Sequence, residues 1–250
     1  MTATPPLDLM TSPAIGPIGP NKPDLDLPPD EVVNSRVSPW FTFWAYPLNQ
    51  RILMPSMFRS IEVVGRENLP ATGPVILAPT HRTRWDSLMV PYSAGRSSSG
   101  RFLRFMVTAN EMRGVQGWLM RNLGCFPVDT NRPGVTSLRY GIELLEQEEM
   151  VVIFPEGGNL RGNRAAGLNR LHPGLARLAL QAETTTPVLV VPMAIDYSDY
   201  DNRRNCDVRV TIGAPIEVEK YRGENAKRSA KNLTEDLAVA MRGLSAATMV

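Results

Sequence analysis

The chain has 250 residues, 43% of them hydrophobic, and this size suits one large α/β domain with a sizeable core better than two separate domains. The formal net charge of +2 at pH 7 argues against a nucleic-acid partner for the chain as a whole. The two cysteines, Cys125 and Cys206, form neither a disulfide framework nor a C-x-x-C metal pattern, and they fit a reducing, cytoplasmic compartment.

Residues 1–39 hold nine of the 22 prolines and few apolar clusters. Because proline removes a backbone donor and interrupts helices, we expect this stretch to be a disordered, unpacked tail. The chain does not start with basic residues followed by an apolar run, so we expect no signal peptide.

Residues 40–60 are rich in aromatic side chains, and no acidic residue occurs between Glu31 and Glu62. Aromatic rings favour the headgroup region of a bilayer, and arginines favour anionic lipid. Pro47 and Pro55 interrupt the segment, which is too polar to span a membrane. The pattern predicts one or two short helices lying on the cytoplasmic face of a bilayer, and the alternative is that the rings pack into the domain's own core. The aromatic residues are Trp40, Phe41, Phe43, Trp44, Tyr46 and Phe58.

Residues 61–250 alternate short β-branched runs with amphipathic segments. This alternation predicts an α/β domain with a central, mostly parallel or mixed sheet flanked by helices. The expected strands are Ile61–Val64, Val75–Ala78, Arg104–Thr108, Val151–Phe154, Val188–Ile195 and Val208–Ile212. The expected helices are Trp85–Ala94, Val115–Asn122, Val135–Gln147, Pro173–Ala182 and Ala226–Leu244.

A histidine and an aspartate flank the turn between the second expected strand and the following helix. Asp86 falls in the first helical turn, from where its carboxylate can reach back to one ring nitrogen of His81. That bond would fix the imidazole tautomer and leave the other nitrogen to act as a base. The alternatives are that Asp86 caps the helix and that His81 is a hydrogen-bonded turn residue.

Two further turns carry glycine, proline and arginine. In VVIFPEGGNLRG the strand ends in Pro-Glu-Gly-Gly, where glycines let backbone amides approach an anion and Arg161 can add a guanidinium. In LGCFPVDTNRPG, Arg132 follows a turn and can hold a phosphate at the mouth of a cleft. An ordinary turn with solvated charges is the alternative for both segments.

These segments, followed by VLVVPMAI, occur in an order that resembles the glycerolipid acyltransferase family, specifically the 1-acylglycerol-3-phosphate acyltransferases. The matching blocks are THRTRWD with His81 and Asp86, GCFPVDT, FPEGG and VPMAI. The resemblance covers residues 60–215 or so. It implies the glycerolipid acyltransferase fold and a fatty acyl transfer from acyl-CoA or acyl carrier protein to a lysophospholipid hydroxyl, which yields phosphatidic acid for phospholipid synthesis.

By this resemblance His81 is the general base and Asp86 orients it. The implied substrate-binding residues are Arg132, Glu156, Gly157, Gly158 and Arg161. The implied chemistry needs a membrane lipid and a thioester donor, with no metal and no further cofactor. Glycerol 3-phosphate or another lysolipid as acceptor, and a non-catalytic peripheral lipid-binding protein, are the alternatives.

Three segments depart from the family pattern. Thr130 stands where an arginine usually ends the second block, Gly158-Asn159 stands where Thr-Arg usually follows, and Thr108 stands where a lysine is often found. The phosphate contacts and the oxyanion donor therefore stay open.

Two other residues, Cys125 and His172, can be explained by a structural role. Cys125 fits a small buried apolar residue. His172 precedes a helix, so it either touches the acceptor phosphate or caps that helix. The chain has no G-x-S-x-G sequence, which argues against a serine hydrolase.

Overall fold

The computed structural model describes residues 35–128, 135–157, 167–199, 205–223 and 225–246. The greater part of the proline-rich N-terminal stretch lies outside these ranges. So do three of the predicted binding residues, Arg132, Gly158 and Arg161.

The described residues form one sheet of eight strands in the order β1-β7-β6-β2-β5-β3-β4, with β8 paired to β6. The pairs β1–β7, β2–β6, β2–β5, β3–β5 and β3–β4 are parallel, whereas β6 runs antiparallel to β7 and β8. The mostly parallel, mixed sheet confirms the predicted fold class. The strands are β1 Ser60–Val64, β2 Val75–Pro79, β3 Leu103–Thr108, β4 Phe126–Val128, β5 Met150–Val152, β6 Leu189–Tyr197, β7 Asp207–Ile212 and β8 Ile216–Glu217.

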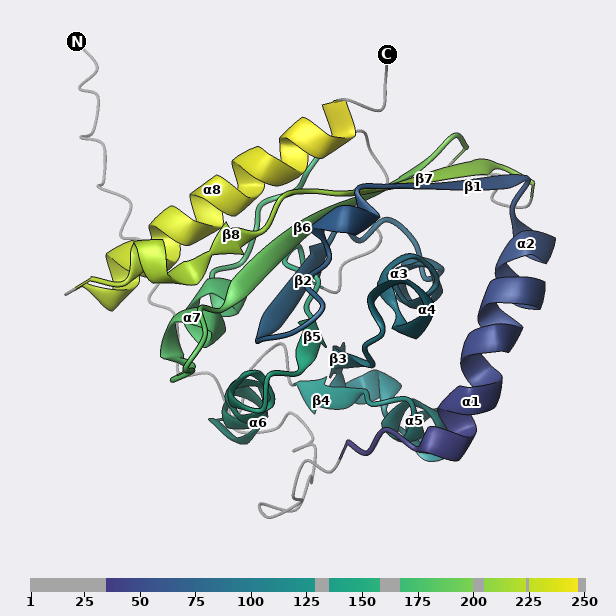
Figure 1. Cartoon of the computed structure of the whole chain (residues 1–250), viewed down its shortest axis with the longest axis horizontal. Helices are drawn as coiled ribbons and strands as arrows, with labels where there is room; N and C mark the ends of the chain where they lie inside the picture. The colour runs from purple at the N-terminus through teal and green to yellow at the C-terminus, as the bar shows by residue number, and fades with distance from the viewer. Residues whose placement is uncertain (1–34, 129–134, 158–166, 200–204, 224, 247–250) are drawn as a thin grey trace, which may run out of the picture. The chain divides into compact units, whose positions relative to one another are not determined.

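Helices cover both faces of this sheet (Figure 1). The central strands are apolar along their whole length because both faces are buried, as β2 shows. Val75 and Leu77 face α3, whereas Ile76 and Ala78 face α6, α7 and α8. The helices after β1 are α3 Asp86–Ala94, α4 Arg96–Ser99, α5 Gly114–Asn122, α6 Val135–Glu146, α7 Gly174–Gln181 and α8 Ala226–Ala246.

A continuous helical run precedes β1. It consists of α1 (Pro39–Leu48), a π-helical turn at Asn49–Leu53 and α2 (Met54–Met57). The hydroxyl of Ser38 caps its start by accepting a hydrogen bond from the Phe41 amide at 3.4 Å. Within the described ranges, no helix combines the length and the hydrophobicity needed to cross a bilayer.

The aromatic side chains of residues 40–60 point in two directions. Phe58 is buried in the core, and burial raises the pKa of the Tyr46 phenol to about 12. Trp40, Phe43 and Trp44 are instead 74%, 67% and 62% exposed. The core-packing alternative therefore describes some of the rings, and the three most exposed rings form an outward apolar surface.

Candidate active site

His81 lies at the carboxyl edge of the sheet, two residues beyond the end of β2. Thr80 extends β2 toward β6, because its amide donates to the Met193 carbonyl at 3.0 Å and its hydroxyl accepts from the Ile195 amide at 2.9 Å. The carboxyl ends of parallel strands are where α/β folds commonly place their ligands. The turn is thus anchored to the central strands of the sheet.

His81 and Asp86 are in contact. Nδ1 of His81 lies 3.1 Å from Oδ2 of Asp86, which is the first residue of α3. The His81 side chain is 14% exposed and that of Asp86 is fully buried. The predicted contact between imidazole and carboxylate is therefore present, and it directs the other ring nitrogen, Nε2, away from Asp86.

The Asp86 carboxylate is held by donors from the turn that precedes α3. Oδ2 accepts from the amides of Arg82 and Thr83 at 2.5 and 2.7 Å, and Oδ1 accepts from the Thr83 hydroxyl at 3.2 Å. The residue at the N-cap of α3 is Trp85, which makes no side-chain capping bond. Because these amides precede the helix, Asp86 folds the turn around itself instead of capping α3, and that alternative is wrong.

Tyr197, the last residue of β6, gives Asp86 a further partner. Its hydroxyl donates to Oδ1 of Asp86 at 2.7 Å, and its oxygen also lies 3.2 Å from the Thr83 hydroxyl oxygen. Burial, followed by the neighbouring Asp86 charge, raises the pKa of the Tyr197 phenol above its usual range. The phenol therefore remains a protonated donor to the carboxylate. Phe58 packs against the rings of both Tyr197 and Trp85, with centroid distances of 5.9 and 6.1 Å.

A buried ion pair joins the histidine turn to the Pro-Glu-Gly turn after β5. Arg82 Nη1 lies 2.9 Å from Oε2 of Glu156, and these side chains are 4% and 0% exposed. Glu156 also accepts from the amides of His81 at 3.1 Å and Asn169 at 3.0 Å. These contacts give Glu156 a clear role in fixing the two turns, and its predicted contact with substrate stays a prediction.

Gly157 closes the second turn with a φ of +78°, which favours glycine. Its amide donates to the Phe154 carbonyl at 3.1 Å, so this donor serves the turn rather than an anion. The Phe154 ring stacks on His81 with centroids 4.2 Å apart. A Cβ added at Gly157 would lie 3.3 Å from the ring of His172, which places this second histidine beside the same turn.

His172 and Cys125 lie in surroundings that bear on their predicted roles. Pro173 is the N-cap of α7, so His172 does not cap that helix, and its contact with a phosphate stays a prediction. Cys125 is 8% exposed, and burial raises the pKa of its thiol to about 12. A thiol with so high a pKa is a poor nucleophile, which agrees with a packing role.

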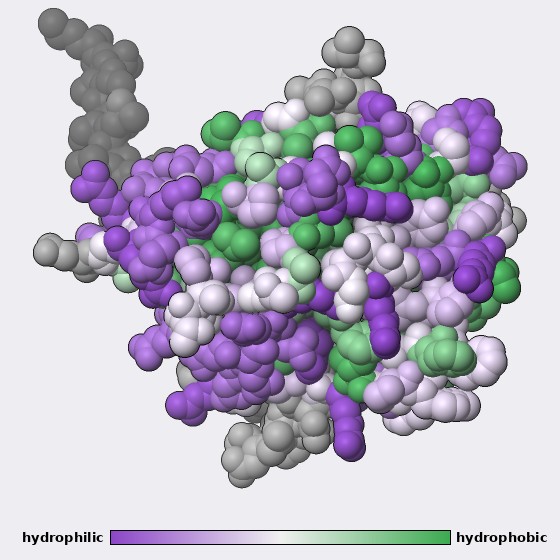
Figure 2. All heavy atoms as spheres, viewed as in Figure 1, coloured by the Kyte–Doolittle hydropathy of each residue, from purple (hydrophilic) through white to green (hydrophobic). Residues whose placement is uncertain are grey.

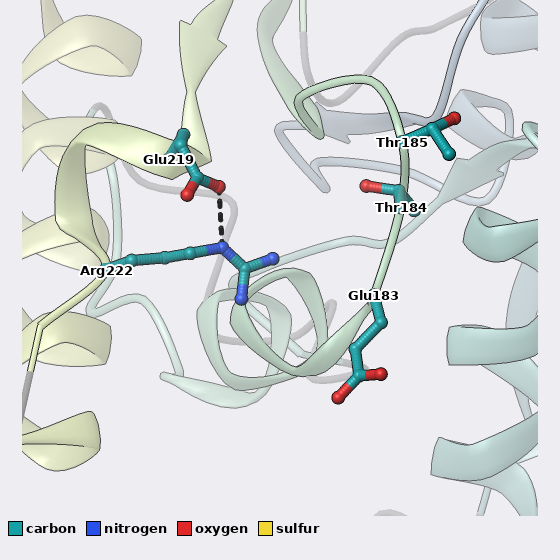
Figure 3. A pocket seen from close by; sticks show the side chains of 5 residues that line it. All are labelled: Glu183, Thr184, Thr185, Glu219 and Arg222. Atoms are coloured by element: carbon teal, nitrogen blue, oxygen red, sulfur yellow. Dashed lines mark hydrogen bonds and ion pairs between the residues drawn. The ribbon is translucent and has the colours of Figure 1, made fainter.

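Two surface hollows lie at the opposite, amino end of the strands. Figure 3 shows the first, between the segment that precedes β6 and the residues that follow β8. Arg222 in this hollow donates to Glu219 at 2.6 Å and to the Leu180 and Ala182 carbonyls at the end of α7. The second hollow surrounds the starts of β2 and β6. Neither hollow is lined by His81 or its neighbours. The first is lined by Glu183, Thr184, Thr185, Glu219 and Arg222.

Comparison with known proteins gives the class. Residues 60–196 match the family model described as Acyltransferase, which is more than half of the chain. The chain therefore belongs to the Acyltransferase family, and the family resemblance drawn from the four sequence blocks is confirmed.

Particular relatives are distant. The 1-acyl-sn-glycerol-3-phosphate acyltransferase of Streptococcus pneumoniae (strain ATCC BAA-255 / R6) is 23% identical over 150 residues, 60% of this chain and 53% of that protein. The protein of the same name from Bacillus subtilis (strain 168) is 29% identical over 108 residues, 41% of this chain and 50% of that protein. The chain thus spans about half the length of the curated relatives it matches.

A solved structure shares the fold. The crystal structure of the 1-acyl-sn-glycerophosphate (LPA) acyltransferase PlsC from Thermotoga maritima superposes with a TM-score of 0.58 at 20% identity. The superposition covers 82% of this chain and 78% of the other. It supports the architecture described above.

Proposed function

We propose that this protein transfers a fatty acyl group from acyl-CoA or acyl carrier protein to the free hydroxyl of 1-acylglycerol 3-phosphate, giving phosphatidic acid for phospholipid synthesis. The observation that carries the proposal is the His81–Asp86 pair, which is held at the carboxyl edge of the sheet within the family-matched span. The names of the two relatives and of the Thermotoga structure support this acceptor.

In the proposed mechanism Nε2 of His81 removes the acceptor's hydroxyl proton as the oxygen attacks the thioester carbonyl. Asp86 holds the proton on Nδ1 and stabilises the imidazolium that forms. The tetrahedral intermediate collapses, the C–S bond breaks, and His81 returns the proton to the thiolate. General base catalysis of this kind contributes about 10²–10⁴-fold. The reaction is direct, with no acyl-enzyme on Cys125.

The phosphate of the acceptor needs cationic partners. We assign this role to Arg132 and Arg161, which flank the Pro-Val-Asp and Pro-Glu-Gly turns in the sequence. An amide such as that of Gly158 can add a backbone donor. Replacement of either arginine by alanine should raise the acceptor KM more than it lowers kcat. An unchanged acceptor KM in both variants would remove them from the site.

A lipid-binding protein without catalytic activity is the alternative from another class. The contacts around Asp86 favour an enzyme, because His81 and its carboxylate are positioned by several independent donors. A binding protein needs no oriented base. The choice between 1-acylglycerol 3-phosphate, glycerol 3-phosphate and another lysolipid depends on an acceptor panel.

The lipid acceptor resides in a membrane and the donor arrives from water, so we place the protein peripherally on the cytoplasmic face of a bilayer. The exposed rings of Trp40, Phe43 and Trp44 supply an apolar contact. Replacing all three by serine should weaken flotation with vesicles. High salt should weaken vesicle flotation of the wild type less than the triple substitution does, because salt does not screen apolar burial.

The decisive assay combines purified protein with acyl-CoA or acyl carrier protein and each of the three acceptors. We expect acylation of 1-acylglycerol 3-phosphate and loss of that product in His81→Ala. Faster acylation of glycerol 3-phosphate would show that the acceptor is wrong. No transfer from either donor to any acceptor would favour the lipid-binding alternative.

A further inference from the structure

Helix α5 carries an exposed apolar face of its own. Val115, Trp118 and Leu119 are 83%, 59% and 38% exposed, and their spacing places them on one side of the helix. Gly117, on another side, is buried, and a Cβ there would lie 2.0 Å from the Met112 carbonyl oxygen. The close approach at Gly117 fixes which side of α5 turns outward.

This face adjoins the exposed face of α1. The Ser38 amide donates to the Asn122 carbonyl at 2.9 Å, so the start of α1 is tied to the end of α5. The rings of Phe41 and Trp118 meet edge to face with centroids 6.1 Å apart. Trp44 lies one helical turn beyond Phe41, on the same side of α1. We define the two-helix face as Trp40, Phe43, Trp44, Val115, Trp118 and Leu119.

The figures show the same proximity. Figure 1 places α5 beside α1, and that part of the surface in Figure 2 is mostly pale, with a smaller green patch. Strongly hydrophilic side chains gather instead over α6 and α7. Large exposed apolar areas of this kind mark contacts with a partner or a membrane.

The two-helix face also lies next to the histidine turn, which contains His81 and Asp86. Arg84, between His81 and Asp86, pairs with Glu111 at 3.1 Å, and Glu111 accepts from Gln116 of α5 at 3.0 Å. Side-chain contacts therefore connect the histidine turn to the start of α5. If α5 lay on a membrane surface, the histidine turn would lie at the edge of the contact area.

The charges beside the face are positive. Neither α1 nor α5 contains an acidic residue, and Glu111 is engaged by Arg84. Arg113 precedes α5 and Arg121 lies in its last turn. Two copies of this chain meeting through the face would bring like charges together, whereas an anionic bilayer complements them.

We infer that α5 is a second membrane-contacting helix, and that the two-helix face rests on a bilayer containing anionic phospholipid with the histidine turn at its rim. The inference rests on the proposed function, because a lipid acceptor that resides in a membrane is the reason for the protein to bind a bilayer. Contact with the bilayer, however, can be measured without any turnover. The two ideas can therefore fail separately.

The first test is vesicle flotation of the triple variant Val115→Ser, Trp118→Ser, Leu119→Ser on neutral vesicles and on vesicles with anionic phospholipid. We expect partition to fall by about tenfold or more, because three apolar side chains lose their burial. Val239 of α8 is 64% exposed on a helix that packs on the other face of the sheet. Val239→Ser should float as the wild type does. Thermal melting of each variant confirms that it is folded.

The second test uses brominated acyl chains, which quench only tryptophans that enter the bilayer. The conservative variant Trp118→Phe should lose part of the quenched emission that the wild type shows. Unchanged flotation of the triple variant, or unchanged quenching in Trp118→Phe, would show that α5 does not contact the membrane. Sedimentation that shows dimers abolished by the triple variant, with flotation intact, would assign the face to a second copy instead. Wild-type transfer to detergent-dispersed acceptor tests the proposed function independently.

Discussion

At both ends of the sheet an arginine is paired with a glutamate, and the two pairs differ chiefly in burial. Arg82 and Glu156 at the carboxyl end are 4% and 0% exposed, whereas Arg222 and Glu219 at the amino end are 35% and 61% exposed. The amino end offers surface hollows, and the carboxyl end offers side chains with fixed partners. We therefore expect the oriented, partly buried histidine, and not the open hollows, to carry the chemistry.

The largest effect should follow from removing that base. His81→Ala should lower transfer by about 10²-fold or more, the usual contribution of a general base, while the protein stays folded. Rates with acyl-CoA donor and thermal melting would be measured together. As a matched surface change at the amino end, Glu183→Ala should keep the wild-type rate. Transfer within about tenfold of wild type in His81→Ala would remove His81 from the general-base role.

A second, also large effect is expected from Asp86→Asn. An amide in place of the carboxylate can support the wrong imidazole tautomer, and it does not stabilise the imidazolium. We expect kcat to fall severely and the acceptor KM to change little. A rate close to wild type would mean that Asp86 serves only to fold the turn through the Arg82 and Thr83 amides.

The same substitution, glutamate to glutamine, should reduce the free energy of unfolding by different amounts at the two ends of the sheet. Glu156→Gln leaves the buried Arg82 without its counter-charge, a change that typically costs about 3–5 kcal/mol. Glu219→Gln breaks an exposed pair, where about 0–1 kcal/mol is typical. Denaturant unfolding of both variants measures the contrast. Equal losses of unfolding free energy would show that burial does not distinguish the two pairs.

Much of this fold could be predicted from sequence because its central strands are continuous apolar runs and its main helices are amphipathic. The missed elements are short: α4 has four residues, β4 three and β8 two, too few for a period to show. The contact of His81 with Asp86 could be predicted because only five positions separate them. Arg82 and Glu156 were harder, since their pairing joins turns 74 positions apart.

Tyr197 could not be found in this way. It lies 111 positions from Asp86, and no local pattern marks it. Only the pairing of β6 beside β2 brings the end of one strand next to the turn that follows the other. A signal was present in hindsight, since Tyr197 ends the long apolar run that contains the VPMAI block. A single polar-tipped ring at the end of a buried strand, however, is common and has many uses.

The smallest predicted effect tests whether this distant phenol serves the base. Tyr197→Phe keeps the ring that packs on Phe58 and removes the hydroxyl, which donates to Asp86 Oδ1 and also contacts the Thr83 hydroxyl. We expect kcat to fall by several-fold up to about tenfold with little change in KM, since about 1.4 kcal/mol corresponds to tenfold and a hydrogen bond to a charged group is worth roughly this much. A double-mutant cycle with Asp86→Asn separates positioning from general packing. If Tyr197 acts through the carboxylate, its removal should change kcat much less when Asp86 is already asparagine. Equal losses in both backgrounds would show that the phenol stabilises the fold without orienting Asp86.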